Sequence, residues 1–482
     1  MSVPLTHQQR VALGQQRRKQ LRRTGHATFS AKHRKQDPLK LLAASVRGRV
    51  PSLLAIKNER MAASPFGYFR GAVPVMAYDL SLMPNTGIDN QLCGDAHVRN
   101  LGAFAAPDGS LVFDINDFDE TIIGPFEWDV KRLATSLILA GREAGAKNGH
   151  CQEAAAVFLD RYRRNIQIFS RMAVLEVARH QVHRLGDVQP IANILKLAER
   201  ATPLHNLLSL TEPAPPAAAH IGVKTATKQA GAKKEAAKKE AAAKKLAPVE
   251  ADSLKAHRIF KTVEPVLTRL TGVIAQTVLD SLSSYAESLQ PERRHFLSQY
   301  TALDVAFKVV GTGSVGLRDY CIYLEGNGAK DPLFLQIKEE TASAYAGYLG
   351  HAADTPSHQG RRVVEGIRAM QLQSDPFLGW TTIKGRDYLV RQLNDHKASI
   401  EISDLRADGL LEYAAVCGEM LARGHARSGD SAVLAGYLGS SERFDAAIVA
   451  FAEAYADQTE LDWKQLVRSL HLKPTAKPAA KK

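Results

Sequence analysis

A low-complexity segment, residues 211–251, interrupts the chain and separates two stretches that have the apolar patterning of folded protein. Its proline-rich start breaks regular structure, and its core, AKKEAAKKEAAAKK, has no apolar face. That composition predicts a solvated, semi-rigid linker or insertion that carries no chemistry. We therefore divide the chain into a basic arm, a first body, the linker, a β-rich part, C-terminal helices and a disordered basic tail, with bounds 1–37, 38–210, 211–251, 252–404, 405–470 and 471–482.

The net charge of +13 raises the question of nucleic-acid binding, so its position along the chain matters. Residues 1–37, 224–245 and 473–482 together carry more than this excess, which leaves the rest of the sequence net acidic. Basic tails of this kind hold polyanions weakly and without reading a sequence. We expect nucleic acid to bind only weakly through the tails, if at all. The arm 1–37 is expected either to form a helix on the body or to be partly disordered.

Targeting and redox signals are absent from the sequence. No apolar run approaches the ~18–20 residues that a membrane span needs, and the N-terminus lacks the apolar core of a signal peptide. The four cysteines are scattered singly, which argues against a zinc site or a disulfide framework. These features predict a cytoplasmic protein with no membrane partner.

Hydrophobic periodicity indicates the fold class. Strand-like runs occur at 110–115, 304–310, 320–324, 333–337 and 388–393. Helical spacing occurs at 128–143, 151–171, 174–183, 254–300 and from 405 onwards. The sequence therefore predicts an α+β fold, in which a small antiparallel sheet is attached to a larger helical mass.

Polar residues that could act in catalysis or metal binding occur between apolar residues in QLCGDAHVRN and FDINDFDE. The side chains of interest are Asp95, His97, Asn100, Asp117 and Asp119, which this setting places on loops. Oxygen ligands a few residues apart suit Mg²⁺, which binds one or two carboxylates together with substrate phosphates. The alternative is that they are ordinary turn and cap residues.

A second cluster lies in KVVGTGSVGLRDYCIYLEG. Gly311, Gly313, Ser314 and Gly316 join two strand-like runs, whereas in a dinucleotide-binding fold the glycines join a strand to a helix. A tight hairpin is the default interpretation. The alternative is the phosphate-covering loop of kinases, which has this strand–loop–strand arrangement.

The next strand, PLFLQIKEE, places Lys338 close to its end, 22 residues after the last glycine. Lys338 resembles the kinase third-strand lysine, which holds the α- and β-phosphates, although it could be a surface lysine. Glu365, in the helical GRRVVEGIRAMQ, is the candidate partner of Lys338, and Glu339 and Glu340 compete with it for that role.

The first cluster resembles the catalytic segment of aminoglycoside and other small-molecule phosphotransferases of the protein-kinase-like superfamily. Their motif His-Gly-Asp-x-His-x-x-Asn corresponds to CGDAHVRN, and their metal-binding Asp-Phe/Trp-x-Asp/Glu corresponds to DFDE. Asp129, twelve residues after Asp117, matches a further Asp that opens a helix. Cys93 replaces the first His, which usually has a structural role.

This resemblance implies a two-lobed kinase-like fold. In kinases the glycine loop and lysine precede the catalytic Asp and Asn, whereas here Asp95 and Asp117 precede Gly311 and Lys338. If both clusters are correctly assigned, the fold is circularly permuted, which surface termini and exposed linkers allow. The competing explanation is that one cluster is a coincidence.

Longer segments point to one family. SPFGYFRGAVPVMAYDLS, FDINDFDETIIGPFEWDVKRLATS, YLVRQLNDHK and LARGHARSGD, together with the segments already quoted, resemble the bacterial domain of unknown function 2252 over about 38–465. That family supplies no established reaction.

The expected function is ATP- and Mg²⁺-dependent phosphoryl transfer to a hydroxyl of an unidentified small molecule, with Asp95 and His97 as the catalytic residues. Asn100 and Asp117 would hold the metal, and Lys338 with the backbone of 311–316 would cradle the phosphates. The alternatives are nucleotidyl transfer on the same fold, or a non-catalytic nucleotide-binding or scaffold protein tethered by its basic tails.

Several charged residues beside apolar runs are weaker candidates. Arg70, Arg391, Asp395 and Lys397 either line the cleft or form structural ion pairs. His425 and Arg427 are explained by favourable placement at a helix C-terminus.

Overall fold

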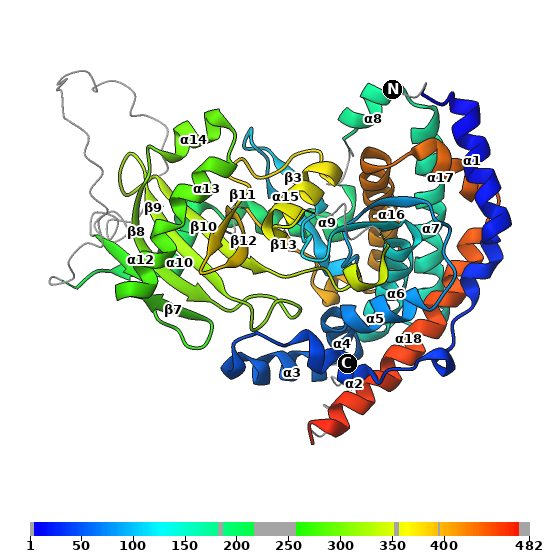
Figure 1. Ribbon diagram of the computed structural model, residues 1–482, viewed down its shortest axis with the longest axis horizontal. Coiled ribbons are helices and arrows are strands. Elements are labelled where there is room, and N and C mark those ends of the chain that lie inside the picture. Colours follow the sequence, from blue (N-terminus) through cyan, green and yellow to red (C-terminus); the bar gives the residue numbers. More distant parts are fainter. Residues whose placement is uncertain (1–3, 182–186, 216–256, 351–355, 394–395, 472–482) are drawn as a thin grey trace.

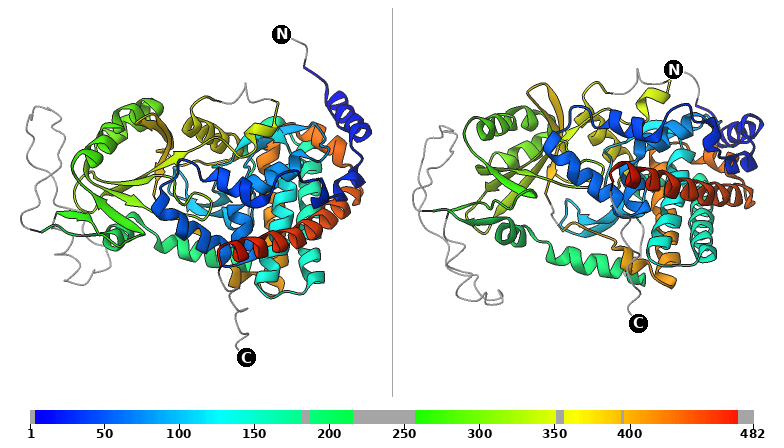
Figure 2. Two further views of the ribbon diagram at one scale, coloured as in Figure 1. Left: turned by 60° about the horizontal axis from the view of Figure 1, so that its bottom comes forward. Right: turned by 90° about the horizontal axis from the view of Figure 1, so that it is seen from below.

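The computed structural model describes residues 4–181, 187–215, 257–350, 356–393 and 396–471. Most of the low-complexity segment, the predicted tail from residue 472 and the candidate Asp395 lie outside the described residues. Within them the chain is α+β, as predicted, and the sheets are antiparallel. The largest sheet lies at one end of the molecule and most of the helices lie at the other (Figures 1 and 2).

The main sheet has six strands in the order β11–β12–β10–β9–β8–β7. Their bounds are β7 Leu267–Leu270, β8 Thr301–Lys308, β9 Asp319–Glu325, β10 Pro332–Glu340, β11 Gly379–Ile383 and β12 Arg386–Gln392. The four strands predicted here, β8, β9, β10 and β12, are confirmed, because each combines β-branched and aromatic residues over a length typical of strands.

The prediction of a helical segment over 254–300 is wrong in its first part. β6 (Arg258–Phe260) and β7 occupy that part, and the helices α12 (Gly272–Asp280), α13 (Leu282–Ser288) and α14 (Pro291–Leu297) follow. Both strands are too short to show a period of two, so their partners in the sheets, and not their own pattern, determine their conformation.

The two faces of the main sheet have different roles. One face packs apolar side chains, such as those of Ile322 and Val390, under α12, α13 and α14. On the other face Asp319, Gln336 and Lys338 are buried side by side, and Gln336 Nε2 donates to Asp319 Oδ2 at 2.6 Å. That polar region faces the helical end of the molecule, because Lys338 bonds to Asp119 there.

The helical end is built around α6 (Glu127–Glu143), which is buried over most of its length. It packs against α7 (Asn148–Arg171) and α18 (Arg443–Ser469), and α16 (Asp408–Ser428) packs along α7. Further helices are α2 Pro38–Ser45, α3 Leu54–Ala62, α4 Pro65–Gly71, α5 Val73–Ser81, α8 Val174–Arg179, α9 Gln189–Arg200, α10 Pro203–Leu210, α15 Gln359–Met370 and α17 Ser431–Leu438. Helices from both ends of the sequence therefore share one core.

Two small sheets bring the motif-bearing loops together. β1 (Asp89–Leu92) pairs with β4 (Ile122–Pro125), and β2 (Leu101–Ala105) pairs with β3 (Leu111–Ile115). The loop from β1 to β2 and the loop from β3 to β4 consequently lie beside one another. β13 (Ala398–Ser399) joins the edge of β2 and ties the chain after β12 to this region.

A third small sheet pairs the strands that precede and follow most of the low-complexity segment. β5 (Thr211–Pro213) pairs antiparallel with β6, with Thr211 opposite Phe260. The chain therefore leaves the described structure and returns to it at neighbouring positions.

Of the two expectations for the basic arm, the structure shows the helix on the body. α1 (His7–Gln20) runs along α17 at the edge of the helical end (Figure 1). Arg18 Nε donates to the Tyr437 carbonyl at 2.8 Å, and His26 Nε2 lies 2.7 Å from the Tyr437 hydroxyl. His26 is fully buried and Arg18 is half-buried in these contacts, whereas Arg17, Lys19 and Arg22 stay exposed.

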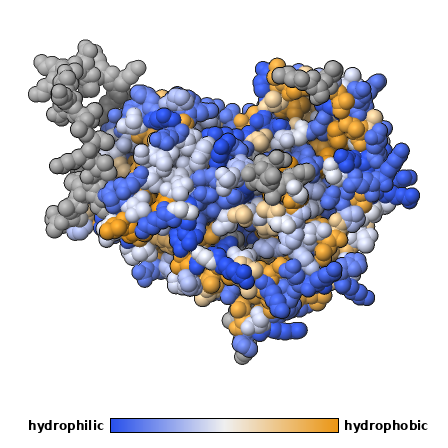
Figure 3. Space-filling model, in the orientation of Figure 1, coloured by the Kyte–Doolittle hydropathy of each residue, from blue (hydrophilic) through white to orange (hydrophobic). Residues whose placement is uncertain are grey.

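Apolar residues are visible in several places on the face shown in Figure 3, among them the region of α8. Ile168, Val174 and Leu175 are exposed there. Within the described residues, none of the helices combines the length and apolarity that crossing a membrane requires.

Candidate active site

Asp129, in the first turn of α6, holds the loop that follows β1. Its carboxylate accepts hydrogen bonds from the backbone N–H groups of Cys93, at 2.8 Å, and Gly94, at 3.0 Å. Gly94 has a φ of +84°, and a Cβ there would lie 2.1 Å from the Glu120 carbonyl oxygen. Only glycine fits this position, where the two loops cross. The Cys93 side chain is also buried, and its burial raises the pKa of its thiol.

The Asp95 carboxylate is held from one side by a buried arginine. Arg132 Nε and Nη2 lie 2.7 and 2.5 Å from Asp95 Oδ1, and the Arg132 guanidinium stacks over the Phe69 ring at 4.2 Å. Asp95 Oδ2 accepts no hydrogen bond from the described residues, and the side chain is 15% exposed. Burial raises the pKa of Asp95, while Arg132 opposes that rise. The carboxylate is thus oriented, with one oxygen left for a ligand.

His97 and Asn100 complete this loop. His97 Nδ1 accepts from the Arg99 N–H at 3.2 Å, which assigns the ring proton to Nε2, 3.6 Å from Asp95 Oδ2. Burial lowers the pKa of His97 well below its ordinary value, so the ring is neutral at pH 7. The Asn100 amide donates to the Asp95 carbonyl at 2.9 Å. Both side chains therefore support Asp95.

The two sequence clusters meet at Lys338. Its ammonium lies 2.5 Å from both carboxylate oxygens of Asp119 and 3.6 Å from Asp117 Oδ1. Burial alone would lower the pKa of Lys338, but the charges of Asp117 and Asp119 more than offset it and raise that pKa. Burial likewise opposes the ionised form of Asp117, yet Lys338, Arg391 and Lys397 lower its pKa. Burial and the charge of Asp117 raise the pKa of Asp119, while Lys338 opposes that rise.

An arginine of α15 fixes the loop that carries these aspartates. Arg362 donates to the carbonyls of Asp119 at 2.8 Å, Thr121 at 2.5 Å and Thr341 at 2.9 Å. Because Thr341 directly follows β10, this one side chain locks the loop to the strand of Lys338. Sequence reasoning passed over Arg362, although it lies in the quoted motif GRRVVEGIRAMQ.

The glycine segment forms the connection between β8 and β9, and its carbonyl groups point to cations from the N-terminal region. Arg49 Nη1 donates to Gly313 and Val315 at 2.7 Å, Lys57 Nζ donates to Thr312 at 3.2 Å, and Arg60 Nη1 donates to Gly311 at 2.9 Å. Within the described chain, the N–H groups of residues 311–314 donate no hydrogen bond. Carbonyls held on one side leave these N–H groups available to an anion.

The chain matches the family described as an uncharacterized protein conserved in bacteria over residues 49–215 and 209–469. The chain belongs to the DUF2252 family. No curated protein and no solved structure matches it. The resemblance seen in the sequence motifs is thereby confirmed for the DUF2252 family, and both loops, the glycine segment and Lys338 fall inside the matched ranges.

Three sequence predictions for the DUF2252 chain need correction or refinement. Glu365 does not reach Lys338, because it pairs with Arg361 at 2.7 Å on the exposed face of α15. Glu339 points to the opposite face of β10, where it pairs with Arg318. Glu340 shares the face of Lys338, is buried, and contributes to the raised pKa of that lysine. Helical spacing alone gave the wrong acidic neighbour, since it does not say which face of α15 meets the sheet.

A helix dipole is only part of the explanation of His425. Although it lies in the last turn of α16, its ring is fully buried. Nδ1 lies 2.8 Å from the Tyr162 hydroxyl and Nε2 lies 3.4 Å from Asp129 Oδ2. His425 thus supports the residue that holds the loop after β1, whereas Arg427 reaches a backbone carbonyl of α8.

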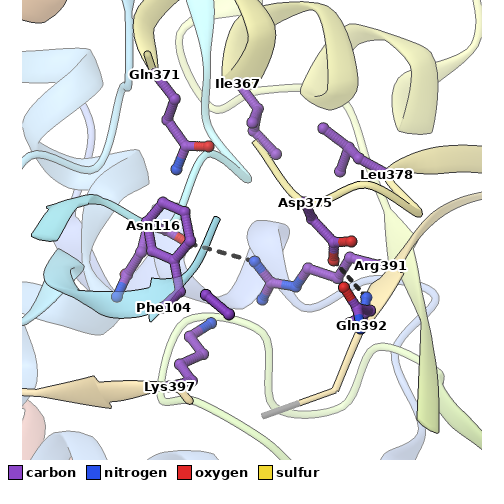
Figure 4. A pocket seen from close by; sticks show the side chains of 10 residues that line it. Phe104, Asn116, Ile367, Gln371, Asp375, Leu378, Arg391, Gln392 and Lys397 are labelled. Atoms are coloured by element: carbon purple, nitrogen blue, oxygen red, sulfur yellow. Dashed lines mark hydrogen bonds between the residues drawn. The ribbon is translucent and has the colours of Figure 1, made fainter. Parts of the chain in front are cut away.

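Arg391 and Lys397 line a hollow of about 60 Å³ between β2, α15 and β12 (Figure 4). Arg391 Nη1 donates to the Asn116 carbonyl at 3.3 Å. Lys397 makes no hydrogen bond or ion pair with the described residues, and burial together with Arg391 lowers its pKa to about 7. Both residues therefore face this hollow.

The oxygen groups of the DUF2252 site fit a metal ion only in part. Within the described residues, no set of three or more His, Cys, Asp or Glu side chains could hold a metal ion by itself. Asp117 Oδ1, however, is buried without a hydrogen-bond partner among them, and the loop of Asn100 adjoins Asp117, because the Asn100 carbonyl accepts from the N–H of Asn116 at 2.9 Å. Such a pair suits Mg²⁺ that takes its other ligands from phosphate groups and water.

Proposed function

We propose that the protein is an ATP- and Mg²⁺-dependent phosphotransferase that acts on a hydroxyl group of a small molecule, with a permuted kinase-like fold. The observation that carries the proposal is the contact of Lys338 with Asp117 and Asp119. It joins segments more than two hundred residues apart that sequence reasoning had assigned to one site. A coincidental match of either cluster would not be expected to bring them together.

The arrangement of the sheet region supports the kinase-like assignment. β8, the glycine segment, β9, β10 with Lys338 and then α15 follow one another in the order in which kinases place their glycine loop, lysine strand and adjoining helix. The loop of Asp95 and Asn100 and the loop of Asp117 precede these parts in the sequence, as permutation requires.

The residues have separable tasks in this proposal. Asp95 Oδ2, oriented through Arg132 and His97, would accept the proton of the acceptor hydroxyl or align it. The N–H groups of residues 311–314 would bind phosphate oxygens, and Lys338 would exchange its carboxylate partners for phosphates. Asn100 and Asp117 would hold Mg²⁺, which when bound neutralises the charge of the phosphates. Catalysis would consist mainly of positioning and electrostatics.

A thermal-shift series tests nucleotide binding. ATP, ADP and GTP are each added with and without Mg²⁺ to the wild type, Asp117→Ala and the control Asp108→Ala, an exposed loop aspartate. A ligand at about 100 times its Kd adds about 2.7 kcal/mol of stability, which gives a measurable shift. We expect a Mg²⁺-dependent ATP shift that only Asp117→Ala removes. No shift with any nucleotide at millimolar concentration would refute the proposal.

A transfer assay tests the chemistry. With γ-labelled ATP and a mixture of small hydroxyl compounds, Asp95→Ala should lose transfer while its ATP shift persists. The mass of the product separates phosphoryl from nucleotidyl transfer. Full transfer by Asp95→Ala would show that the catalytic assignment is wrong.

A further inference from the structure

A hollow of about 400 Å³ opens beside the candidate site, between α3, α4 and the glycine segment. Three arginines line it, one each from α3, α4 and the loop after β1: Arg60, Arg70 and Arg99. Glu143 is the one carboxylate among the lining residues. The wall therefore has an excess of positive charge, and the volume of the hollow suits a small molecule.

Arg70 is the exceptional member of this set. Arg60 donates to carbonyls of the glycine segment, and Arg99 pairs with Glu401 at 3.3 Å. Arg70 makes no hydrogen bond or ion pair with the described residues, and its Nε is buried. Burial and the charge of Arg99 lower the pKa of Arg70. The Nε of Arg70 is withdrawn from water without an acceptor, which is unfavourable unless a ligand supplies one.

The hollow adjoins the reacting region. Arg70 interacts electrostatically with both Asp95 and Asp117. Gly311 and Thr312, at the beginning of the glycine segment, form part of the same wall. A molecule in this hollow would therefore contact both the glycine segment and the arginine that interacts with Asp95.

We propose that this hollow binds an anionic group, a carboxylate or a phosphate, of the acceptor, with Arg70 as its principal partner. The inference rests on the proposed function and names the class of acceptor: a small acidic molecule that carries a hydroxyl. The planar fork of a guanidinium matches both anions in a bidentate manner. Aminoglycosides are polycations, and the three arginines would repel them. The acceptor thus differs in charge from that of the enzymes whose catalytic motif this chain resembles.

The first test measures anion binding by titration calorimetry without nucleotide. Inorganic phosphate and acetate are the probes, and the aminoglycoside kanamycin is the opposite-charge control. Arg70→Gln should weaken the binding of the preferred anion at least tenfold, since a charge-assisted pair is lost. Arg361→Gln, which alters an exposed arginine on α15, should leave the affinity unchanged.

Arg70→Lys keeps the charge but not the fork, so an affinity between those of the wild type and Arg70→Gln is expected. Unfolding curves verify that each variant is folded, and Arg99→Gln provides a second change to the same wall. If Arg70→Gln binds phosphate and acetate as the wild type does, or if the wild type binds neither at 100 mM, the inference is refuted. Binding of kanamycin in preference to both anions would refute it as well.

The two proposals fail in different ways. Loss of anion binding in Arg70→Gln with an intact Mg²⁺–ATP thermal shift supports both. Arg70-dependent anion binding without any nucleotide shift would retain the anion site and remove the phosphotransferase assignment. A nucleotide shift without Arg70-dependent anion binding would retain the phosphotransferase assignment and remove the anion site.

Discussion

Asp129→Ala should be among the most destabilising substitutions near the candidate site. The carboxylate of Asp129 is 1% exposed and accepts two backbone N–H groups, those of Cys93 and Gly94. Hydrogen bonds to a charged group contribute about 1.5–3 kcal/mol each, and the variant leaves both donors buried without an acceptor. The expected loss is therefore about 3–5 kcal/mol of unfolding free energy, a large part of the 5–15 kcal/mol typical of folded proteins.

Urea unfolding followed by circular dichroism measures this loss. Asp408→Ala is the matched control, because Asp408 also lies in the first turn of a long helix, α16, but is exposed. The control should change the unfolding free energy by less than about 0.5 kcal/mol. If Asp129→Ala loses less than about 1 kcal/mol, the carboxylate does not hold the loop in the way described, and the reasoning fails.

Further predictions concern glycine, lysine and arginine positions. Gly94→Ala should cost about 3 kcal/mol or more of unfolding free energy, because its Cβ would overlap a carbonyl oxygen. Gly109→Ala should cost about 1 kcal/mol, because Gly109 has a similar φ of +81° but no atom within 4 Å of a Cβ. Equal losses in urea unfolding would contradict this. Burial lowers the pKa of Lys131 from 10.5 to about 8, so between these pH values the unfolded chain binds more protons and the unfolding free energy rises with pH. Lys131→Met should remove that rise and add about 3 kcal/mol of unfolding free energy at pH 7. An unchanged pH slope would refute the assignment of this pH dependence to Lys131. Arg362→Gln should lower the unfolding free energy by about 2–4 kcal/mol, because three carbonyl groups lose their donor. The control Arg361→Gln, at an exposed position, should lower it by less than about 0.5 kcal/mol. Similar losses in the two variants would show that the carbonyl contacts contribute little.

Local patterns explain what the sequence could predict. β9 and β10 were predictable because their runs are long and rich in β-branched and aromatic residues. The position of Lys338 beside Asp117 was predictable from two short motifs, because each places its residues at the end of a strand or in the loop that follows. The strand at 258–260 was not, since three residues show no periodicity and pair only with a distant partner.

The supporting contacts of the site had no signal along the chain. Arg132 contacts Asp95 from the buried side of α6. In the sequence, an arginine within a helical pattern is expected at an exposed position. Lys57 bonds the glycine segment from 255 residues away. Such pairs depend on how α3 and α6 pack, and periodicity describes an element without describing its partner. Arg70 was considered from the sequence, yet only the structure distinguishes a lining residue from an ion pair.

The pairing of β5 with β6 affects how the family can diversify. Because residues 213 and 258 lie opposite each other in one ribbon, the intervening segment begins and ends at the same place on the surface. Its length can then change without moving the strands or loops that form the site, and each doubling would cost only about 0.6 kcal/mol of closure entropy. Insertions, deletions or a whole added module at this junction are therefore compatible with an unaltered geometry of the candidate site, which makes it the natural position for a fluorescent or affinity tag.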